Sequence, residues 1–211
     1  MTRRRIAALA APIALIASTF VVFNRAVEVL GLRWGYLTGF VFFWFVWCLG
    51  FSWWALGTRG VIDVFRDVRP RLPSPTGLWI VLLAVPVVGG FAIVWWPSAA
   101  AATMEVVAVA LLIAAVNSTL EELFWRGVYA RLFADSLVLG WLYPAVAFAA
   151  WHVSPTSVMG STPMIVGGAL YVGLVYGYVA LRTQSVRWTT VAHFLLNATG
   201  MGFALLVVGR A

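Results

Sequence analysis

Two adjacent carboxylates and an arginine, Glu121, Glu122 and Arg126, interrupt a long apolar stretch of this sequence. In a helix that crosses a bilayer each such charge costs on the order of 3 kcal/mol, so it needs a partner or a chemical purpose. Glu122 and Arg126 are four residues apart and share one helix face, which favours an ion pair. Glu121 lies about 100° round the helix, one turn after Asn117, so we expect it to meet different partners, supplied by other helices.

The chain has only two histidines, and each has a notable residue four positions away: Phe148 precedes His152, and Asn197 follows His193. A carboxylate, two imidazoles and a carboxamide in a pocket of low dielectric constant suit the hydrolysis of an amide. Glu121 can draw a proton from water, and His152 can orient that water or pass the proton to the leaving amine. His193 and Asn197 can donate hydrogen bonds to a developing oxyanion. The glutamate and both histidines are also a possible zinc set with one position open for water, although the sequence has no His-Glu-x-x-His motif.

The three patterns occur in a fixed order: Glu-Glu-x-x-x-Arg at 121–126, Phe-x-x-x-His at 148–152 and His-x-x-x-Asn at 193–197. Together they resemble the CPBP family of intramembrane proteases, also called the ABI or CAAX-protease-like family. That family includes the CAAX prenyl endopeptidase and bacteriocin-processing or immunity proteins. The resemblance covers roughly residues 103–205, and the first hundred residues carry no motif that we can match.

The resemblance implies an intramembrane endopeptidase with four catalytic residues. Glu121 and His152 would act on the attacking water, and His193 and Asn197 would form the oxyanion hole. No cofactor is expected on this interpretation. If a metal binds, zinc held by Glu121, His152 and His193 is the alternative.

The remaining motif residues are expected to support the site. Glu122 and Arg126 would form a structural ion pair, and Phe148 and Asn117 would line the pocket.

Other functions compete with the protease. A non-catalytic immunity or scaffolding member would carry the same motifs, with the polar groups only joining helices by hydrogen bonds. A transporter or proton relay would also bury Glu, His and Arg, but the paired repeats with broken helices that favour a transporter are not apparent.

Composition places the chain in a membrane. Of its residues 63% are hydrophobic and only 10% are charged, with a mean hydropathy of +0.97. These values exclude an ordinary soluble domain, whose charged fraction is about a quarter. We expect a multi-pass protein of the cell membrane, with the lipid bilayer and a peptide or protein substrate as partners. The net charge of +7 comes from dispersed arginines, which argues against nucleic-acid binding.

The predicted fold is all-α, a transmembrane helix bundle of about seven spans with one interfacial amphipathic helix. The expected spans are 6–23, 35–57, 77–96, 104–133, 137–153, 164–181 and 188–208, with a polar link at 24–34 and an uncharged loop at 154–163. Within 58–76, Val61, Val64, Phe65 and Val68 recur at helical spacing opposite charged residues, which predicts the amphipathic helix, ended by Pro70 and Pro73. The aromatic residues of the second span are expected to contact lipid and the membrane interface.

The chain divides into two parts on this interpretation. Residues 1–102 hold three spans and the amphipathic link, and residues 103–211 hold the catalytic bundle. The positive-inside rule then predicts the orientation N-in/C-out. The arginines expected on the cytoplasmic side are Arg3, Arg4, Arg5, Arg59, Arg66, Arg69, Arg71, Arg131, Arg182 and Arg187, against Arg25, Arg33 and Arg210 outside.

Overall fold

The computed structural model describes residues 1–66, 71–160 and 162–209, and throughout these residues the regular structure is helical. This confirms the all-α prediction, and helices satisfy every backbone polar group within their own segment, as a bilayer requires. The first part of the chain contains α1 (Arg3–Phe42), η1 (Phe43–Phe51), α2 (Ser52–Arg66), α3 (Thr76–Gly90), η2 (Phe91–Trp95), α4 (Trp96–Ser98) and η3 (Ala99–Ala101). The second part contains α5 (Met104–Glu122), η4 (Leu123–Val128), α6 (Tyr129–Leu132), η5 (Val138–Leu142), α7 (Tyr143–Trp151), α8 (Val153–Met159), α9 (Thr162–Thr183), α10 (Arg187–Thr199) and α11 (Met201–Val208).

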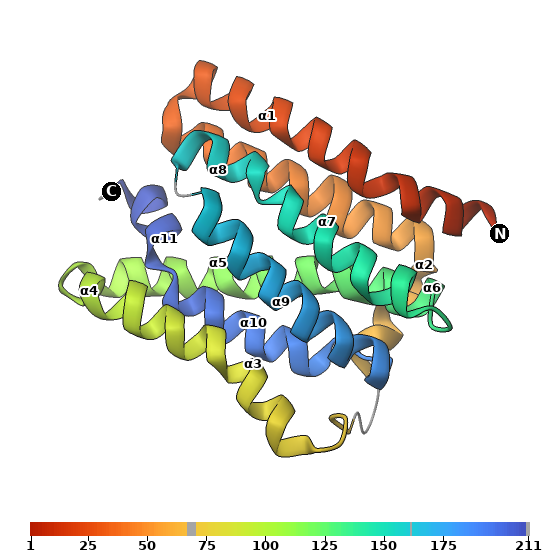
Figure 1. The fold of residues 1–211 in the computed structure, drawn as a ribbon. Helices are drawn as coiled ribbons and strands as arrows, with labels where there is room; N and C mark the ends of the chain where they lie inside the picture. The colour runs from red at the N-terminus through yellow and green to blue at the C-terminus, as the bar shows by residue number, and fades with distance from the viewer. Residues whose placement is uncertain (67–70, 161, 210–211) are drawn as a thin grey trace.

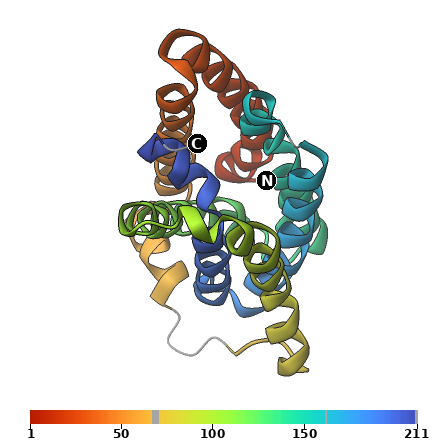
Figure 2. The same cartoon turned by 90° about the vertical axis from the view of Figure 1, so that its left-hand side faces the viewer.

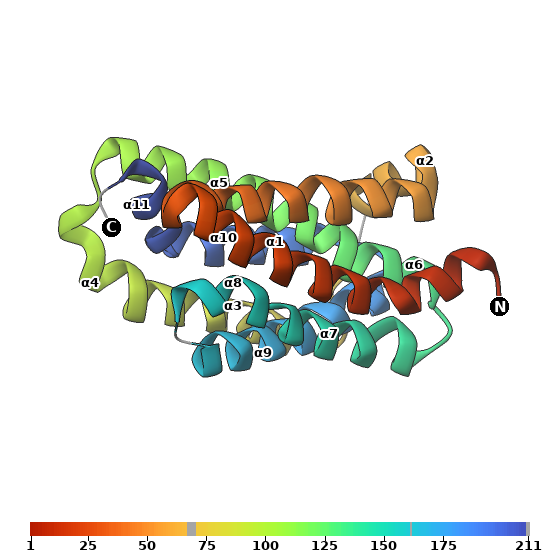
Figure 3. The ribbon, with the colours of Figure 1, turned by 90° about the horizontal axis from the view of Figure 1, so that it is seen from above.

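The helices form one bundle around α5. In Figure 1, α5 crosses behind α9, with α10 and α3 on one side of it and α7, α1 and α2 on the other. The view from above shows the N-terminus beside α6 and the C-terminus at the opposite end, near α4 (Figure 3). Seen from the side, the helices surround a common interior (Figure 2).

Within the described residues, four helical stretches are long and apolar enough to cross a membrane: Arg3–Arg66, Thr76–Ser98, Met104–Leu132 and Pro163–Thr183. The first stretch contains two of the expected spans, 6–23 and 35–57, because the chain reverses at Gly31 without a long break in the helix. Helices able to span a membrane are therefore present, whereas the count of seven and the N-in/C-out orientation stay predictions.

The polar link expected at 24–34 is wrong. Helix α1 continues through it, with an exposed pair between Arg25 Nη1 and Glu28 Oε2 at 2.8 Å on its surface. The chain turns only at Gly31, whose φ of 76° lies in the left-handed region that glycine adopts without a steric penalty. Charged residues three or four apart pair on a helix surface, so polarity alone did not mark a break.

The amphipathic segment after Gly57 is helical as far as the structure describes it. Val64 is buried and packs against Leu123, Ala180 and Val186, while Asp63 and Arg66 on the other face are exposed. The predicted continuation through Asp67, Val68 and Arg69 and the stop at Pro70 lie outside the described residues.

Two expectations near the C-terminus are also wrong. The loop expected at 154–163 is in large part helix α8, which ends at Gly160 with φ 80°. The last span, expected over 188–208, is two helices, because Gly200 leaves helical geometry with ψ 72° between α10 and α11. A single glycine can end a helix without changing mean hydropathy, so an apolar window does not detect it.

The aromatic residues of the second span divide between surface and core. Phe45, Trp53 and Trp54 are exposed, in keeping with the predicted lipid contact, whereas Phe43 and Trp44 are buried at 0% and 5% exposure. The lipid-contact prediction is therefore wrong for these two residues, because a helix packed on one side presents its aromatic residues to both environments.

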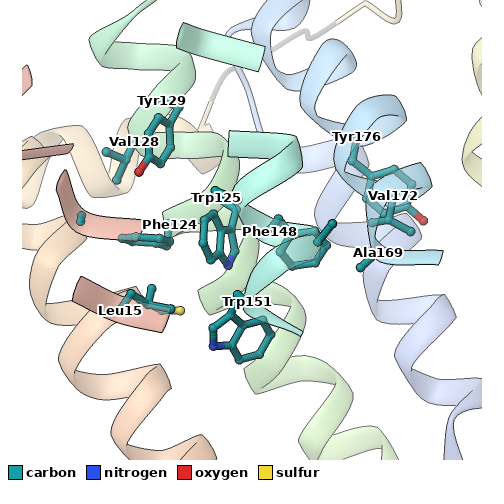
Figure 4. Packing of buried hydrophobic residues seen from close by; sticks show 14 of the residues in the cluster. Leu15, Phe124, Trp125, Val128, Tyr129, Phe148, Trp151, Ala169, Val172 and Tyr176 are labelled. Atoms are coloured by element: carbon teal, nitrogen blue, oxygen red, sulfur yellow. The ribbon is translucent and has the colours of Figure 1, made fainter. Parts of the chain in front are cut away.

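The buried aromatic residues join residues 1–66 to the second part of the chain. The Trp125 and Phe148 rings meet edge to face with centroids 5.7 Å apart, and Figure 4 shows them beside Trp151 at the centre of the core. Phe43 stacks on Trp151 at 3.9 Å. This packed layer holds η1, η4 and α7 in fixed positions next to the polar residues described below.

Candidate active site

Glu121 and Glu122 are the last two residues of α5, and Arg126 follows in the π-helical stretch η4. All three are buried, with exposures of 2%, 0% and 3%. Arg126 Nη1 lies 3.1 Å from Glu122 Oε1, in the i, i+4 relation that the spacing favours. The guanidinium carbon of Arg126 also lies 4.2 Å from the centre of the Phe148 ring, so the cation is covered by an aromatic face.

His193 on α10 lies between the two glutamates. Its Nδ1 is 2.8 Å from Glu122 Oε1, and its Nε2 is 3.6 Å from Glu121 Oε2. We expected the two carboxylates to meet different partners, and for His193 this expectation is wrong. Its two ring nitrogens lie on different sides of the imidazole, so one ring reaches both carboxylates. The carboxylate accepts the hydrogen bond, so Nδ1 carries the hydrogen.

His152 is the residue that follows α7, and its ring is partly exposed. Its Nδ1 lies 2.8 Å from the carbonyl oxygen of Phe148, which can only accept, so the hydrogen is on Nδ1 and Nε2 has a free lone pair. Within the described residues His152 and Glu121 form no direct hydrogen bond or ion pair. They instead border the same cavity.

Two cavities meet at the candidate residues. One of about 360 Å³ is lined by Glu121, Asn117, His152, Asn197 and Tyr36 among others. The second, of about 330 Å³, is lined by Phe148, His152, His193, Asn197 and Gly90 among others.

Among the candidate site residues, His152 and Asn197 border both cavities. The side-chain nitrogen Nδ2 of Asn197 is buried and makes no hydrogen bond within the part of the chain that is described. A buried N–H group without an acceptor is costly, which makes it a donor available to a bound molecule.

The alternative zinc set does not assemble in this geometry. Among the described residues, no three side chains of His, Cys, Asp or Glu are placed to hold one metal ion, and Glu121, His152 and His193 are no exception. His193 Nδ1 is engaged by Glu122 and His152 Nδ1 by a backbone carbonyl, so only the Nε2 atoms of the two rings are left as possible ligands. We therefore derive no step through a metal.

Comparison with known proteins agrees with the motifs. Residues 103–199 match the family model of the Rce1-like type II CAAX prenyl endopeptidases. This segment is therefore similar to the CAAX-protease family. The match confirms the resemblance and contains every candidate site residue, since the Rce1-like segment begins before Asn117 and ends after Asn197. It covers a little under half of the chain, and comparison with curated proteins and with solved structures gave no match.

Sequence reasoning missed three residues that the structure places beside the Rce1-like motifs. Tyr36 lines the cavity of Glu121, and Trp44 Nε1 donates to Asn117 Oδ1 at 2.7 Å. Both lie outside the Rce1-like segment, in an aromatic stretch that gives no signal for either position. The third, Thr189, is fully buried and interacts with Glu122. It lies one turn before His193, so the i, i+4 spacing could have found it.

Proposed function

We propose that this protein is an intramembrane endopeptidase that hydrolyses a peptide bond with a water molecule activated by Glu121, without a metal. The observation that carries the proposal is a buried cluster of Glu121, Glu122, Arg126 and His193 that opens, through Glu121 and His193, on two adjoining cavities. A purely structural ion pair would account for Glu122 and Arg126. It would not account for the second carboxylate, Glu121, or for the cavities beside the cluster.

The proposed mechanism requires one proton arrangement of this cluster. With a neutral His193, the cluster would hold two negative charges and one positive charge away from water, which is costly. One further proton on Nε2 of His193 balances the two glutamates. In that state Glu121 is a carboxylate that can act as a base, and His193 is a donor at both ring nitrogens.

The attacking water is placed between Glu121 and His152, which border one cavity. One hydrogen of the water points to the Glu121 carboxylate and the other to the free lone pair of His152 Nε2. Glu121 removes its proton as the water oxygen forms a bond to the substrate carbonyl carbon, and the carbonyl oxygen becomes negative.

Asn197 and His193 stabilise that oxyanion. Asn197 Nδ2 has no other acceptor among the described residues. His193 Nε2, at 3.6 Å from Glu121, is beyond ordinary hydrogen-bond distance, so its N–H group is available to the substrate. Donors that are fixed before the reaction, in a site shielded from water, contribute strongly to transition-state stabilisation. As the carbon–nitrogen bond breaks, the proton held by Glu121 moves to the leaving amine, and the carboxylate is restored.

The substrate class follows from the surroundings of the site. The cavities lie among apolar helices, so we propose a peptide or protein that reaches the site from the bilayer or its surface. Similarity to the CAAX-protease family does not by itself make the substrate prenylated.

A quenched-peptide library incubated with the purified protein in detergent tests the proposal. Cleavage that is lost in Glu121→Ala, His152→Ala and His193→Ala supports it. Members of one catalytic unit act together, so each change alone should lower turnover a hundredfold or more. A wild-type protein that folds and cleaves no peptide would favour a non-catalytic member of the family instead.

A further inference from the structure

The Rce1-like segment is in contact with a tryptophan that lies outside it. Trp44 belongs to η1, a nine-residue π-helical stretch, and its Nε1 donates to Oδ1 of Asn117 at 2.7 Å. Trp44 is 5% exposed, and it packs against Phe40 with ring centroids 5.4 Å apart. The indole is therefore held by its neighbours and meets Asn117 in a fixed direction.

The chemistry of the two groups sets which way the Asn117 amide points. An indole N–H can only donate, so the end of the amide that faces Trp44 must be the oxygen. The amide nitrogen is then turned away from Trp44. Glu121 follows one helical turn later and borders the same cavity as Asn117. Because a carboxylate can only accept a hydrogen bond, the amide nitrogen is the end of the Asn117 side chain that suits Glu121.

Not every buried tryptophan in this core donates a hydrogen bond from its indole nitrogen. Nε1 of Trp125 and Nε1 of Trp151 are both buried and make no hydrogen bond within the described residues. The core thus leaves two indole nitrogens without an acceptor, whereas the indole that faces Asn117 forms a short bond. Burial alone does not explain why this one is partnered.

We propose that Trp44 is a positioning residue for the proposed peptidase: it fixes the Asn117 amide so that its N–H group orients the Glu121 carboxylate toward the cavity. This rests on the proposed function of Glu121. Without Trp44 the amide can rotate and present its oxygen to Glu121, which would repel the carboxylate and misdirect it. Residues 1–66 thereby supply part of the catalytic geometry.

Trp44→Phe tests this proposal because it keeps an aromatic ring and removes only the donor. We expect kcat to fall roughly tenfold with KM within about twofold, since small misplacements of a catalytic group cost rate. The matched control is Trp47→Phe, in the same helical stretch, which removes a comparable bond from Trp47 Nε1 to Ser18 Oγ at 3.0 Å and should leave kcat unchanged.

A double-mutant cycle separates positioning from simple packing. If Trp44 acts through Asn117, Trp44→Phe should have no further effect on kcat in an Asn117→Ala protein. Equal effects of Trp44→Phe in both backgrounds, or a Trp44→Phe protein with wild-type kcat, would overturn the proposal while the peptidase function stands. Absence of wild-type cleavage would overturn both.

A second variant keeps the proposal testable if Trp44→Phe does not fold. Asn117→Asp retains an acceptor for the indole but has no N–H group to offer Glu121. We expect it to lower kcat at least as much as Asn117→Ala. Full kcat in Asn117→Asp would show that the amide donor is not used.

Discussion

Nδ1 of His193 lies 2.8 Å from Oε1 of Glu122, the same oxygen that contacts Arg126 at 3.1 Å. One carboxylate oxygen therefore joins α10 to the junction of α5 and η4, and all three groups are buried. Glu121, by contrast, lies 3.6 Å from the other nitrogen of His193 and lines a cavity. The two neighbouring glutamates differ in surroundings, and this difference supports the proposal of a structural role for Glu122 and a chemical role for Glu121.

Glu122→Gln should destabilise the protein. The change leaves the Arg126 cation buried without a counter-charge, which typically costs about 3 to 5 kcal/mol. The melting temperature in detergent should fall clearly. Adding Arg126→Met should recover part of the loss, though not all of it, because His193 also loses its charged acceptor. A Glu122→Gln protein as stable as the wild type would contradict the structural assignment.

Gly90 should tolerate substitution less well than Gly89, its neighbour in α3. A Cβ at Gly90 would collide with Thr199 Oγ1 and approach Leu196 on α10, whereas a Cβ at Gly89 meets nothing within 4 Å. Gly89→Ala should therefore stabilise α3 by about 0.5 to 1 kcal/mol, the usual gain inside a helix. Gly90→Ala should lose that gain and lower turnover, because Gly90 lines both cavities. Equal stability and turnover of the two variants would argue against close contact of α3 and α10.

Metal removal should not change activity. Prolonged dialysis against a strong chelator strips a catalytic zinc held by three protein ligands, and activity then returns only when metal is restored. We expect the dialysed enzyme to cleave peptide at the original rate, with no stoichiometric zinc by elemental analysis. Activity that follows zinc content would overturn the metal-free mechanism.

The arginine distribution predicts the orientation of the chain in the membrane. A reporter fused after Ala211 should be active on the outer side, and one inserted near Arg71 should be active in the cytoplasm. The turn at Gly31 keeps Arg25 and Arg33 between the same two spans, so the correction at 24–34 leaves the arginine count unchanged. A cytoplasmic C-terminus would show that the count of seven spans is wrong.

The sequence predicted what depends on local spacing. Glu122 and Arg126 meet because a helix brings residues four apart together, and Gly57 ended the second span where expected. Long apolar stretches likewise predicted membrane helices, since a bilayer allows few other structures.

Contacts between distant segments could not be predicted in the same way. The two bonds of His193 depend on how α10 packs on α5, and the bond of Trp44 to Asn117 joins residues 73 positions apart. In a stretch rich in aromatic residues, nothing distinguishes the buried Trp44 from the exposed Trp53. The break at Gly200 was not predicted because single glycines in apolar sequence are common within transmembrane helices.

The comparison of Glu121→Gln with the wild type tests the central claim most directly. The variant removes the base and keeps the size of the side chain, and Glu28→Gln, at an exposed carboxylate, is the control. Peptide cleavage and the melting temperature should be measured on the same detergent preparations. We predict that Glu121→Gln melts at or above the wild-type temperature and that its turnover falls a hundredfold or more, with Glu28→Gln unchanged in both. A folded Glu121→Gln protein that cleaves peptide at the wild-type rate would contradict the mechanism.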